Sequence, residues 1–167
     1  MRNALRISVT QKCNLKCPYC HNEGQLKSDN EMSLEKIKRI ADAAKAAGIK
    51  KIKITGGEPL LRKDIVEIVK AFKGFEDISM VTNGVYLDKY AFKLKKAGLH
   101  RINIGCDSLK NKHLQNRKNM IKGLNACKKA GFSNLKLNMV VLKGVNDSEI
   151  KDLIGFAKKN KFNKIKI

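Results

Sequence analysis

Strand-like and helix-like segments alternate along almost the whole of this 167-residue chain, and this alternation restricts the folds that it can adopt. Six short apolar runs with strand character cover residues 5–9, 52–54, 78–81, 101–106, 135–141 and 164–167. Strands that alternate with helices over short connections require right-handed crossovers and a parallel sheet. Six strands are two fewer than a closed (β/α)8 barrel contains, so we predict an α/β fold with a partial (β/α)6 barrel of parallel strands.

Five amphipathic stretches with helical periodicity separate these runs. The first begins after Ser33, a residue type that caps helix N-termini. The others cover residues 65–72, 87–97, 120–130 and 150–157. Three of the five stretches end in an Ala-Gly pair, which predicts three helix ends of one type, at Gly48, Gly98 and Gly131.

Three cysteines, Cys13, Cys17 and Cys20, lie within eight residues directly after the first apolar run. Four thiolates complete the coordination of a [4Fe–4S] cluster, whereas three leave one iron free to bind a small molecule. A structural zinc site would combine the three cysteines with His21, but such sites usually draw their ligands from two separated pairs. Disulfides are disfavoured because the chain has an odd number of cysteines, five. We therefore favour an iron–sulfur cluster, with zinc as the alternative.

Unusual residues follow successive predicted strands. The segment Thr55-Gly56-Gly57-Glu58-Pro59 follows the second strand, Thr82-Asn83-Gly84 the third and Asp107-Ser108 the fourth, while Lys136 and Asn138 interrupt the apolar fifth. Taken singly, each has a structural explanation as a turn or a helix cap. Because active sites of α/β folds lie at the carboxyl ends of the strands, their recurrence there predicts a functional site.

The chain is strongly basic, with 36 Lys and Arg against 15 Asp and Glu and a formal net charge of +21. Nucleic-acid binding is one interpretation, but no helix-turn-helix, zinc-finger or aromatic RNA-binding signature supports it, and an anionic substrate explains the charge equally well. No apolar run approaches the roughly 20 residues that span a bilayer. We expect a cytoplasmic protein without a membrane partner, whose residues 1–167 form a single domain.

The cysteine spacing, three residues and then two, with Tyr19 before the last cysteine, resembles that of the radical S-adenosylmethionine (SAM) superfamily. Within it, several segments resemble the GTP 3′,8-cyclase family of molybdenum cofactor biosynthesis. These segments are residues 5–10, 54–62, 97–104 and 137–147. Residues 21–24 are similar to archaeal members of that family. The resemblance covers essentially the whole chain and implies a radical SAM core fold.

The resemblance also implies cofactors and site residues. Cys13, Cys17 and Cys20 would hold a [4Fe–4S] cluster that binds S-adenosylmethionine and cleaves it to a 5′-deoxyadenosyl radical. The radical would take a hydrogen from C3′ of GTP, and the carbon radical would close onto C8 of guanine. The residues implied to contact S-adenosylmethionine are Tyr19, Gly56, Gly57, Glu58, Pro59, Gly105 and Asn138. The residues implied to bind GTP are Arg6, Lys53, Thr82 and Lys136.

The implied partners are GTP, an electron donor such as ferredoxin or flavodoxin, and a second iron–sulfur cluster. Family members carry that cluster on a further C-terminal segment with three cysteines, which Cys106 and Cys127, as predicted core thiols, cannot replace. We therefore expect a truncated chain, one half of a split enzyme or a minimal radical enzyme with another substrate, and no complete GTP cyclisation by the isolated chain. The alternatives are a radical enzyme of another subfamily, such as a glycyl-radical activase, and a basic nucleic-acid-binding module with a structural metal.

Overall fold

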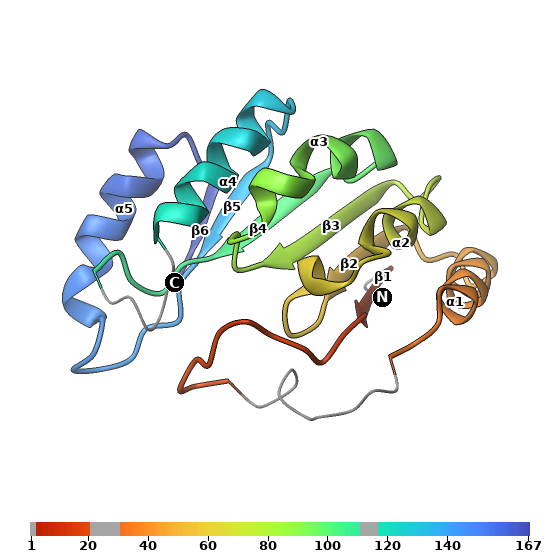
Figure 1. The fold of residues 1–167 in the computed structure, drawn as a ribbon, viewed down its shortest axis with the longest axis horizontal. Coiled ribbons are helices and arrows are strands. Elements are labelled where there is room, and N and C mark those ends of the chain that lie inside the picture. Colours follow the sequence, from red (N-terminus) through yellow and green to blue (C-terminus); the bar gives the residue numbers. More distant parts are fainter. Residues whose placement is uncertain (1–2, 21–30, 111–116) are drawn as a thin grey trace.

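A computed structural model describes residues 3–20, 31–110 and 117–167, in which strands and helices alternate as predicted (Figure 1). The strands are β1 (Ala4–Ser8), β2 (Lys51–Thr55), β3 (Asp77–Thr82), β4 (Arg101–Gly105), β5 (Leu135–Asn138) and β6 (Lys164–Lys166). The helices are α1 (Leu34–Ala46), α2 (Ile65–Ala71), α3 (Leu87–Ala97), α4 (Arg117–Lys129) and α5 (Ile150–Lys159), with short 3-10 turns η1 (Pro59–Leu61) and η2 (Asp147–Glu149).

The six strands form one parallel sheet in the order β1-β2-β3-β4-β5-β6. Each strand pairs with the next along the chain, so every connection is a crossover through a helix. In the described part of the chain β1 and β6 are the two edges of the sheet, which is therefore open. The predicted α/β fold with a partial barrel of six parallel strands is confirmed.

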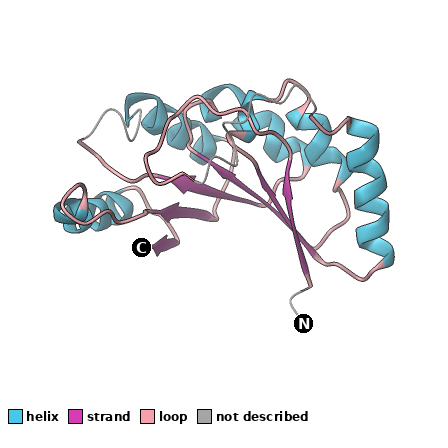
Figure 2. Cartoon of the chain, turned by 90° about the horizontal axis from the view of Figure 1, so that it is seen from below, coloured by secondary structure: helices cyan, strands magenta, loops and turns pink. Residues whose placement is uncertain are grey.

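The two faces of the sheet differ in chemistry, because side chains alternate along each strand. One face packs under the helices (Figure 2) and is apolar, with Ile54, Met80 and Ile104 fully buried. The other face, which we call the open face, carries the residues between them, such as Arg6, Lys53 and Lys136. Parallel sheets are usually apolar on both faces, so a polar face indicates a binding surface.

The helices form where the sequence supplies caps and apolar stripes. Ser33 caps α1, because its Oγ accepts a hydrogen bond from the Lys36 backbone N–H at 3.2 Å. Three helix ends share one left-handed geometry, with φ of 71°, 103° and 80° at Gly48, Gly98 and Gly131. The predicted Ala-Gly endings are thereby confirmed. No helix in the described ranges is both long enough and apolar enough to cross a membrane.

The fifth strand is shorter than predicted. It ends at Asn138 instead of continuing through residue 141. The reason is tertiary, because the Val140 backbone N–H donates to the Asp107 carboxylate at 2.8 Å instead of to a neighbouring strand. The Met139 N–H still donates to the Lys166 carbonyl of β6 at 2.8 Å, so the chain leaves the sheet at Val140.

Candidate active site

A pocket lies at the carboxyl ends of β2, β3 and β4, where the sequence predicts a site. Its lining combines the cysteine loop with the residues that follow these strands: Leu15, Cys17, Tyr19, Thr55, Gly56, Gly57, Val81, Thr82, Asn83, Gly105 and Asp107. Four of the residues that the resemblance assigns to S-adenosylmethionine, Tyr19, Gly56, Gly57 and Gly105, therefore line one cavity.

The cysteine loop, residues 10–20, is bonded to the ends of successive strands. After β2, the Gly57 and Glu58 backbone N–H groups donate to the carbonyls of Thr10 and Lys12, both at 2.8 Å. After β3, the Asn83 side-chain amide donates to Asn14 Oδ1 at 2.9 Å. In Figure 1 the segment after β1 accordingly runs along the edge of the sheet. The glycine pair is needed because a Cβ on Gly57 would lie only 2.4 Å from the Lys12 carbonyl oxygen.

A third attachment joins the cysteine loop to the end of β4. The Tyr19 hydroxyl donates a hydrogen bond to the Asp107 carboxylate. Burial raises the pKa of Asp107, and the bonds from Tyr19 and the Val140 N–H act in the opposite direction. Sequence reasoning placed Asp107 at a strand end without giving it a partner, because that partner lies 88 residues away in the chain.

The Glu58 carboxylate is fully buried and already hydrogen-bonded within the protein. It accepts from the Leu60 N–H at 3.0 Å, the Thr82 hydroxyl at 2.7 Å and the Asn83 N–H at 2.7 Å. Burial raises its pKa, and these three bonds act against that rise. Glu58 therefore ties the ends of β2 and β3 together, and Pro59 is buried beside it at the start of η1.

The five cysteines fall into two groups. Cys13 and Cys17 are half-buried and Cys20 is exposed, all in the loop. Burial raises the pKa of Cys13 and Cys17, so their thiolates need a nearby positive charge to be stable. Cys106 and Cys127 are fully buried, and burial raises the pKa of Cys127 to about 12. The prediction that these two are core thiols is confirmed.

The part of the chain that the structure describes holds no group of three His, Cys, Asp or Glu side chains gathered as ligands of one metal ion. His21, the fourth zinc ligand considered above, lies outside the described residues. Ligands of a cluster need no such convergence, because each thiolate binds a different iron.

Asn138 ends β5 on the open face, where it is paired with Gly105 of β4. Its Oδ1 is buried without a hydrogen-bond partner. A buried amide oxygen without a donor is costly, by about 1–3 kcal/mol. The absence of Cβ at Gly105 leaves room beside it, so this atom is available to a donor group on a ligand.

The open face is strongly basic. Register and alternation place on it one acidic residue of the described strands, Asp77, and these cations: Arg6, Lys51, Lys53, Arg101, Lys136, Lys164 and Lys166. Arg101 is bonded to Asp77 through Nε at 2.7 Å and through Nη2. The other cations leave a positive surface that matches a polyphosphate.

Lys136 lies at the centre of this charge. Burial lowers its pKa, and so do the neighbouring cations Lys166, Lys53, Lys164 and Arg101. The structure therefore brings together three of the predicted GTP residues, Arg6, Lys53 and Lys136, on one face of the sheet. Sequence reasoning missed Arg101, Lys164 and Lys166, although the Lys-Ile-Lys alternation of β6 signals a one-sided basic strand.

Thr82, the fourth predicted GTP residue, points away from the open face. Its hydroxyl donates to Glu58 and accepts from the Gly84 N–H at 3.0 Å. The residue of β3 that faces the open side at this level is Val81, which pairs with Asn103. Thr82 thus lines the pocket while its hydroxyl organises the turn after β3.

We expect Lys136 to react faster with amine reagents than ordinary surface lysines at pH 8. Its lowered pKa leaves a larger fraction as free amine, about tenfold for each unit of pKa. Lys50 and Lys110 serve as controls, because ion pairs with Glu76 and Asp152 raise their pKa. Competitive acetylation read by mass spectrometry measures all three together. Equal labelling of Lys136 and Lys50 would contradict this electrostatic description of the open face.

Arg62 is a structural residue of the site that the sequence did not reveal. Its buried guanidinium donates from Nη1 to the carbonyls of Val9 and Met32, at 2.9 and 2.8 Å. Its Nε and Nη2 bond both oxygens of Asp64, at 2.8 and 2.6 Å. Val9 directly precedes the cysteine loop, and Met32 lies further along the chain after it. Arg62 therefore holds together two backbone positions on either side of the loop in the sequence.

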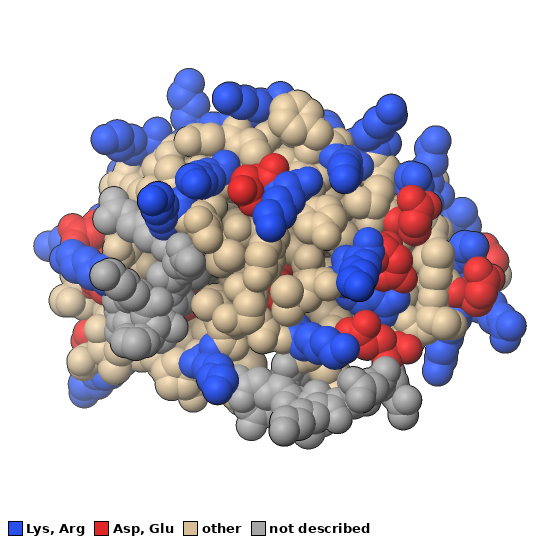
Figure 3. Space-filling view, in the orientation of Figure 1, with Lys and Arg blue, Asp and Glu red and all other residues tan. Residues whose placement is uncertain are grey.

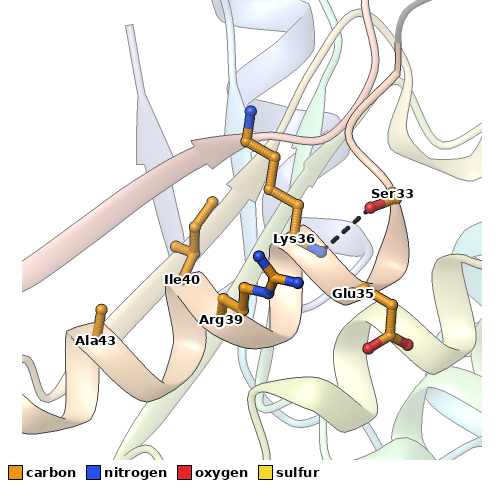
Figure 4. A pocket seen from close by; sticks show the side chains of 6 residues that line it. All are labelled: Ser33, Glu35, Lys36, Arg39, Ile40 and Ala43. Carbon is orange, nitrogen blue, oxygen red and sulfur yellow. Dashed lines mark hydrogen bonds between the residues drawn. The ribbon is translucent and has the colours of Figure 1, made fainter.

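A second pocket and the charge on the helix-covered surface are separate from this site. A second pocket lies along the outer side of α1 (Figure 4), lined by Ser33, Glu35, Lys36, Arg39, Ile40 and Ala43 and by none of the strand-end residues. Figure 3 shows Lys and Arg side chains spread over the visible face with acidic residues among them. Among the described residues on this face, the basic side chains are spread out and are not gathered in the single patch that is typical of a nucleic-acid interface.

Comparison with known protein sequences agrees with the geometry. The chain is 47% identical over 166 residues to a probable GTP 3′,8-cyclase of Archaeoglobus fulgidus, covering 96% of this chain and 55% of the relative. It is 50% identical over 163 residues to a probable GTP 3′,8-cyclase of Pyrococcus horikoshii, covering 92% and 51%. The chain thus spans about half the length of the curated relatives that it matches.

Solved structures share the fold. The [FeFe]-hydrogenase maturase HydG superposes with a TM-score of 0.66 at 16% identity, over 82% of this chain and 35% of HydG. BtrN, solved in complex with AdoMet and 2-DOIA, gives 0.56 at 21% identity, over 73% and 55%. The family model described as the radical SAM superfamily matches residues 7–157. With its cysteine loop at the carboxyl ends of a six-stranded parallel sheet, the chain belongs to the radical SAM superfamily.

Proposed function

We propose that this chain is the catalytic core of a radical SAM enzyme that acts on GTP in a 3′,8-cyclisation of molybdenum cofactor biosynthesis. The observation that carries the proposal is the contact between two surfaces at one sheet edge. The pocket under the cysteine loop and the basic open face meet at Gly105 and Asn138. A cofactor in the pocket would therefore lie beside a polyphosphate on the open face.

The donor set of the loop fits a [4Fe–4S] cluster. Cys13, Cys17 and Cys20 would bind three irons, and the iron charge would offset the burial that raises the pKa of Cys13 and Cys17. When bound, the cluster supplies the electron that cleaves S-adenosylmethionine to a 5′-deoxyadenosyl radical. The protein keeps the loop in register with the pocket through the bonds from Gly57, Glu58 and Asn83.

The chemistry of the pocket lining suits S-adenosylmethionine. Gly56 and Gly57 permit close approach of a ligand to the backbone, and Tyr19 and Gly105 also line the cavity. Asn138 offers its unpaired oxygen to a hydroxyl or ammonium donor. Glu58 would act indirectly, because its carboxylate accepts from three protein donors, two of them on the pocket residues Thr82 and Asn83. Pro59 follows it at the start of η1.

The open face fits the triphosphate of GTP. Arg6 offers a two-pronged donor, and Lys53 and Lys136 supply point charges close to the pocket. Bound there, the ribose would be held next to the cofactor, and positioning of this kind is the main contribution of the protein to radical chemistry. Thr82 would act on GTP indirectly, by holding the turn that begins at Asn83.

The proposal includes an electron donor, a second cluster and a cellular location. An electron donor such as ferredoxin or flavodoxin would reduce the cluster. A C-terminal segment or a partner chain would bring a second [4Fe–4S] cluster to hold the guanine. We place the enzyme in the cytoplasm, because a cluster held by three cysteine thiolates suits a compartment in which thiols stay reduced.

The test is electron paramagnetic resonance of the chain reconstituted with iron and sulfide without oxygen, reduced, and recorded with and without S-adenosylmethionine. We expect a reduced-cluster signal that changes when the ligand is added. A cluster indifferent to S-adenosylmethionine, or no cluster, would overturn the radical SAM proposal.

GTP binding to the same sample tests the substrate. Lys136→Met and Lys53→Met should each weaken GTP binding about tenfold or more, the loss expected for a charged hydrogen bond. The matched control is Lys50→Met. Lys50 directly precedes β2, and its side chain forms an ion pair with Glu76. A ligand-sensitive cluster combined with no GTP binding would assign the chain to another radical SAM subfamily. Salt-dependent binding of nucleic acid, unaffected by both variants, would favour the nucleic-acid module.

A further inference from the structure

We propose that Asp107 is a positioning residue that fastens the cysteine loop to the end of β4 through the Tyr19 hydroxyl. The inference rests on the proposed function only in treating this loop as the holder of the cluster. We call the pair Tyr19 and Asp107 the latch.

The two oxygens of Asp107 have separate tasks. Oδ2 accepts the hydrogen bond from the Tyr19 hydroxyl, and Oδ1 accepts from the Val140 N–H at 2.8 Å. The residue is only 6% exposed, so water competes little for either oxygen. The bond to Val140 sets the rotation of the carboxylate, and this rotation aims the other oxygen at the loop.

Hydrogen bonds from the β5–α5 connection hold the backbone around Asp107. Asn146 is fully buried, and its side-chain amide donates to the carbonyls of Asp107 at 2.7 Å and Val140 at 2.9 Å. Glu149 accepts from the Ser108 hydroxyl at 2.6 Å and the Leu109 N–H at 2.8 Å. Asp107 thus stands on a segment held from both sides by residues of the β5–α5 connection.

Tyr19 is the point at which holding the loop has most effect on the cysteines. It lies between Cys17 and Cys20, and its hydroxyl is also within hydrogen-bonding reach of the Cys17 thiol. The backbone bonds to Gly57 and Glu58 hold only Thr10 and Lys12, at the start of the loop. Among the described residues, the hydrogen bond that ties the Cys17–Cys20 turn to the sheet edge is the one through Tyr19. The latch therefore sets the position of these two sulfurs over the pocket.

The test compares Tyr19→Phe, Asp107→Ala and the double variant. Tyr90→Phe on α3 and Asp152→Asn on α5 are the controls. They remove a tyrosine hydroxyl and a carboxylate at positions outside the loop. Amide hydrogen exchange of residues 13–20 is measured on the metal-free chain. We expect exchange about tenfold or more faster in each latch variant, as for loss of a hydrogen bond to a charged group. The double variant should be no faster than the faster single, because both remove one interaction.

Two further readouts separate the latch from general stability and from the proposed function. In Tyr19→Phe the amides of β2 and β3 should exchange at the wild-type rate. In Asp107→Asn, which keeps one acceptor oxygen, the exchange rate of residues 13–20 should lie between those of the wild type and Asp107→Ala. In reconstituted protein, iron release to a chelator should accelerate in parallel. Wild-type exchange in Tyr19→Phe, or additive effects in the double variant, would overturn the latch. A wild-type chain that holds no cluster would overturn the proposed function instead, and the metal-free exchange would still decide on the latch.

Discussion

Replacing Gly57 with alanine will displace the cysteine loop from the end of β2. A Cβ at this position would lie 2.4 Å from the Lys12 carbonyl oxygen and 2.9 Å from that of Gln11, and both are backbone atoms that cannot rotate away. The loop must move, which breaks the bonds from the Gly57 and Glu58 N–H groups to Thr10 and Lys12. We expect about 1–3 kcal/mol of lost stability from the overpacking. Iron retention by the reconstituted variant should fall at least about tenfold, because all three ligands lie on the displaced loop.

Gly155→Ala is the matched control for this prediction. Gly155 lies inside α5, and nothing is within 4 Å of a Cβ built on it. Alanine there should raise stability by up to about 1 kcal/mol, since glycine is the poorer helix former. Urea denaturation and iron content are measured on both variants. Wild-type iron retention in Gly57→Ala would show that the loop is not held by its contact with the glycine pair.

The fold could be predicted because its signals are local. The apolar stripes, the Ser33 cap and the Ala-Gly helix ends each act over a few residues, and alternation of strand and helix leaves few topologies. The sequence also predicted that Gly57, Thr82 and Asp107 lie close together, because parallel strands end at one edge of a sheet. Both predictions need only the period of the apolar residues, the order of the strands and their common direction.

The partners of the site residues could not be predicted, because they depend on tertiary contacts. Nothing near Arg62 in the sequence indicates that it bonds Val9, or that Tyr19 meets Asp107. The resemblance assigned Glu58 to S-adenosylmethionine without indicating that three protein donors surround its carboxylate. The basic open face was hidden for another reason, because lysine is so frequent in this chain that its alternation in single strands carries little weight.

Replacing Arg62 with methionine will destabilise the chain by about 3 kcal/mol, the lower end of the cost of breaking a buried ion pair, because its partners are partly exposed. Methionine keeps most of the side-chain volume but leaves Asp64 unpaired and the Val9 and Met32 carbonyls without a donor. Urea denaturation measures the change. The free energy of unfolding of Arg62→Lys should lie between those of the wild type and Arg62→Met. One ammonium group cannot replace a guanidinium that bonds two carbonyls and a carboxylate. Arg39→Met on the exposed side of α1 is the control (Figure 4).

The pH dependence of this loss identifies its cause. Arg62 lowers the pKa of Asp64 below its ordinary value of 3.8, so the pair adds stability above that pH and loses it as pH falls through the lowered pKa. The difference between wild type and Arg62→Met should therefore narrow in acid. The part that persists belongs to the Val9 and Met32 carbonyls, which do not titrate. Because the Val9 carbonyl directly precedes the cysteine loop, amides of residues 10–20 should exchange faster in the variant even at a pH at which Asp64 is protonated and the ion pair is lost. A loss of stability that is constant with pH would show that the ion pair with Asp64 contributes little to it. Unchanged exchange of residues 10–20 would contradict the role of Arg62 in holding the start of the cysteine loop through Val9.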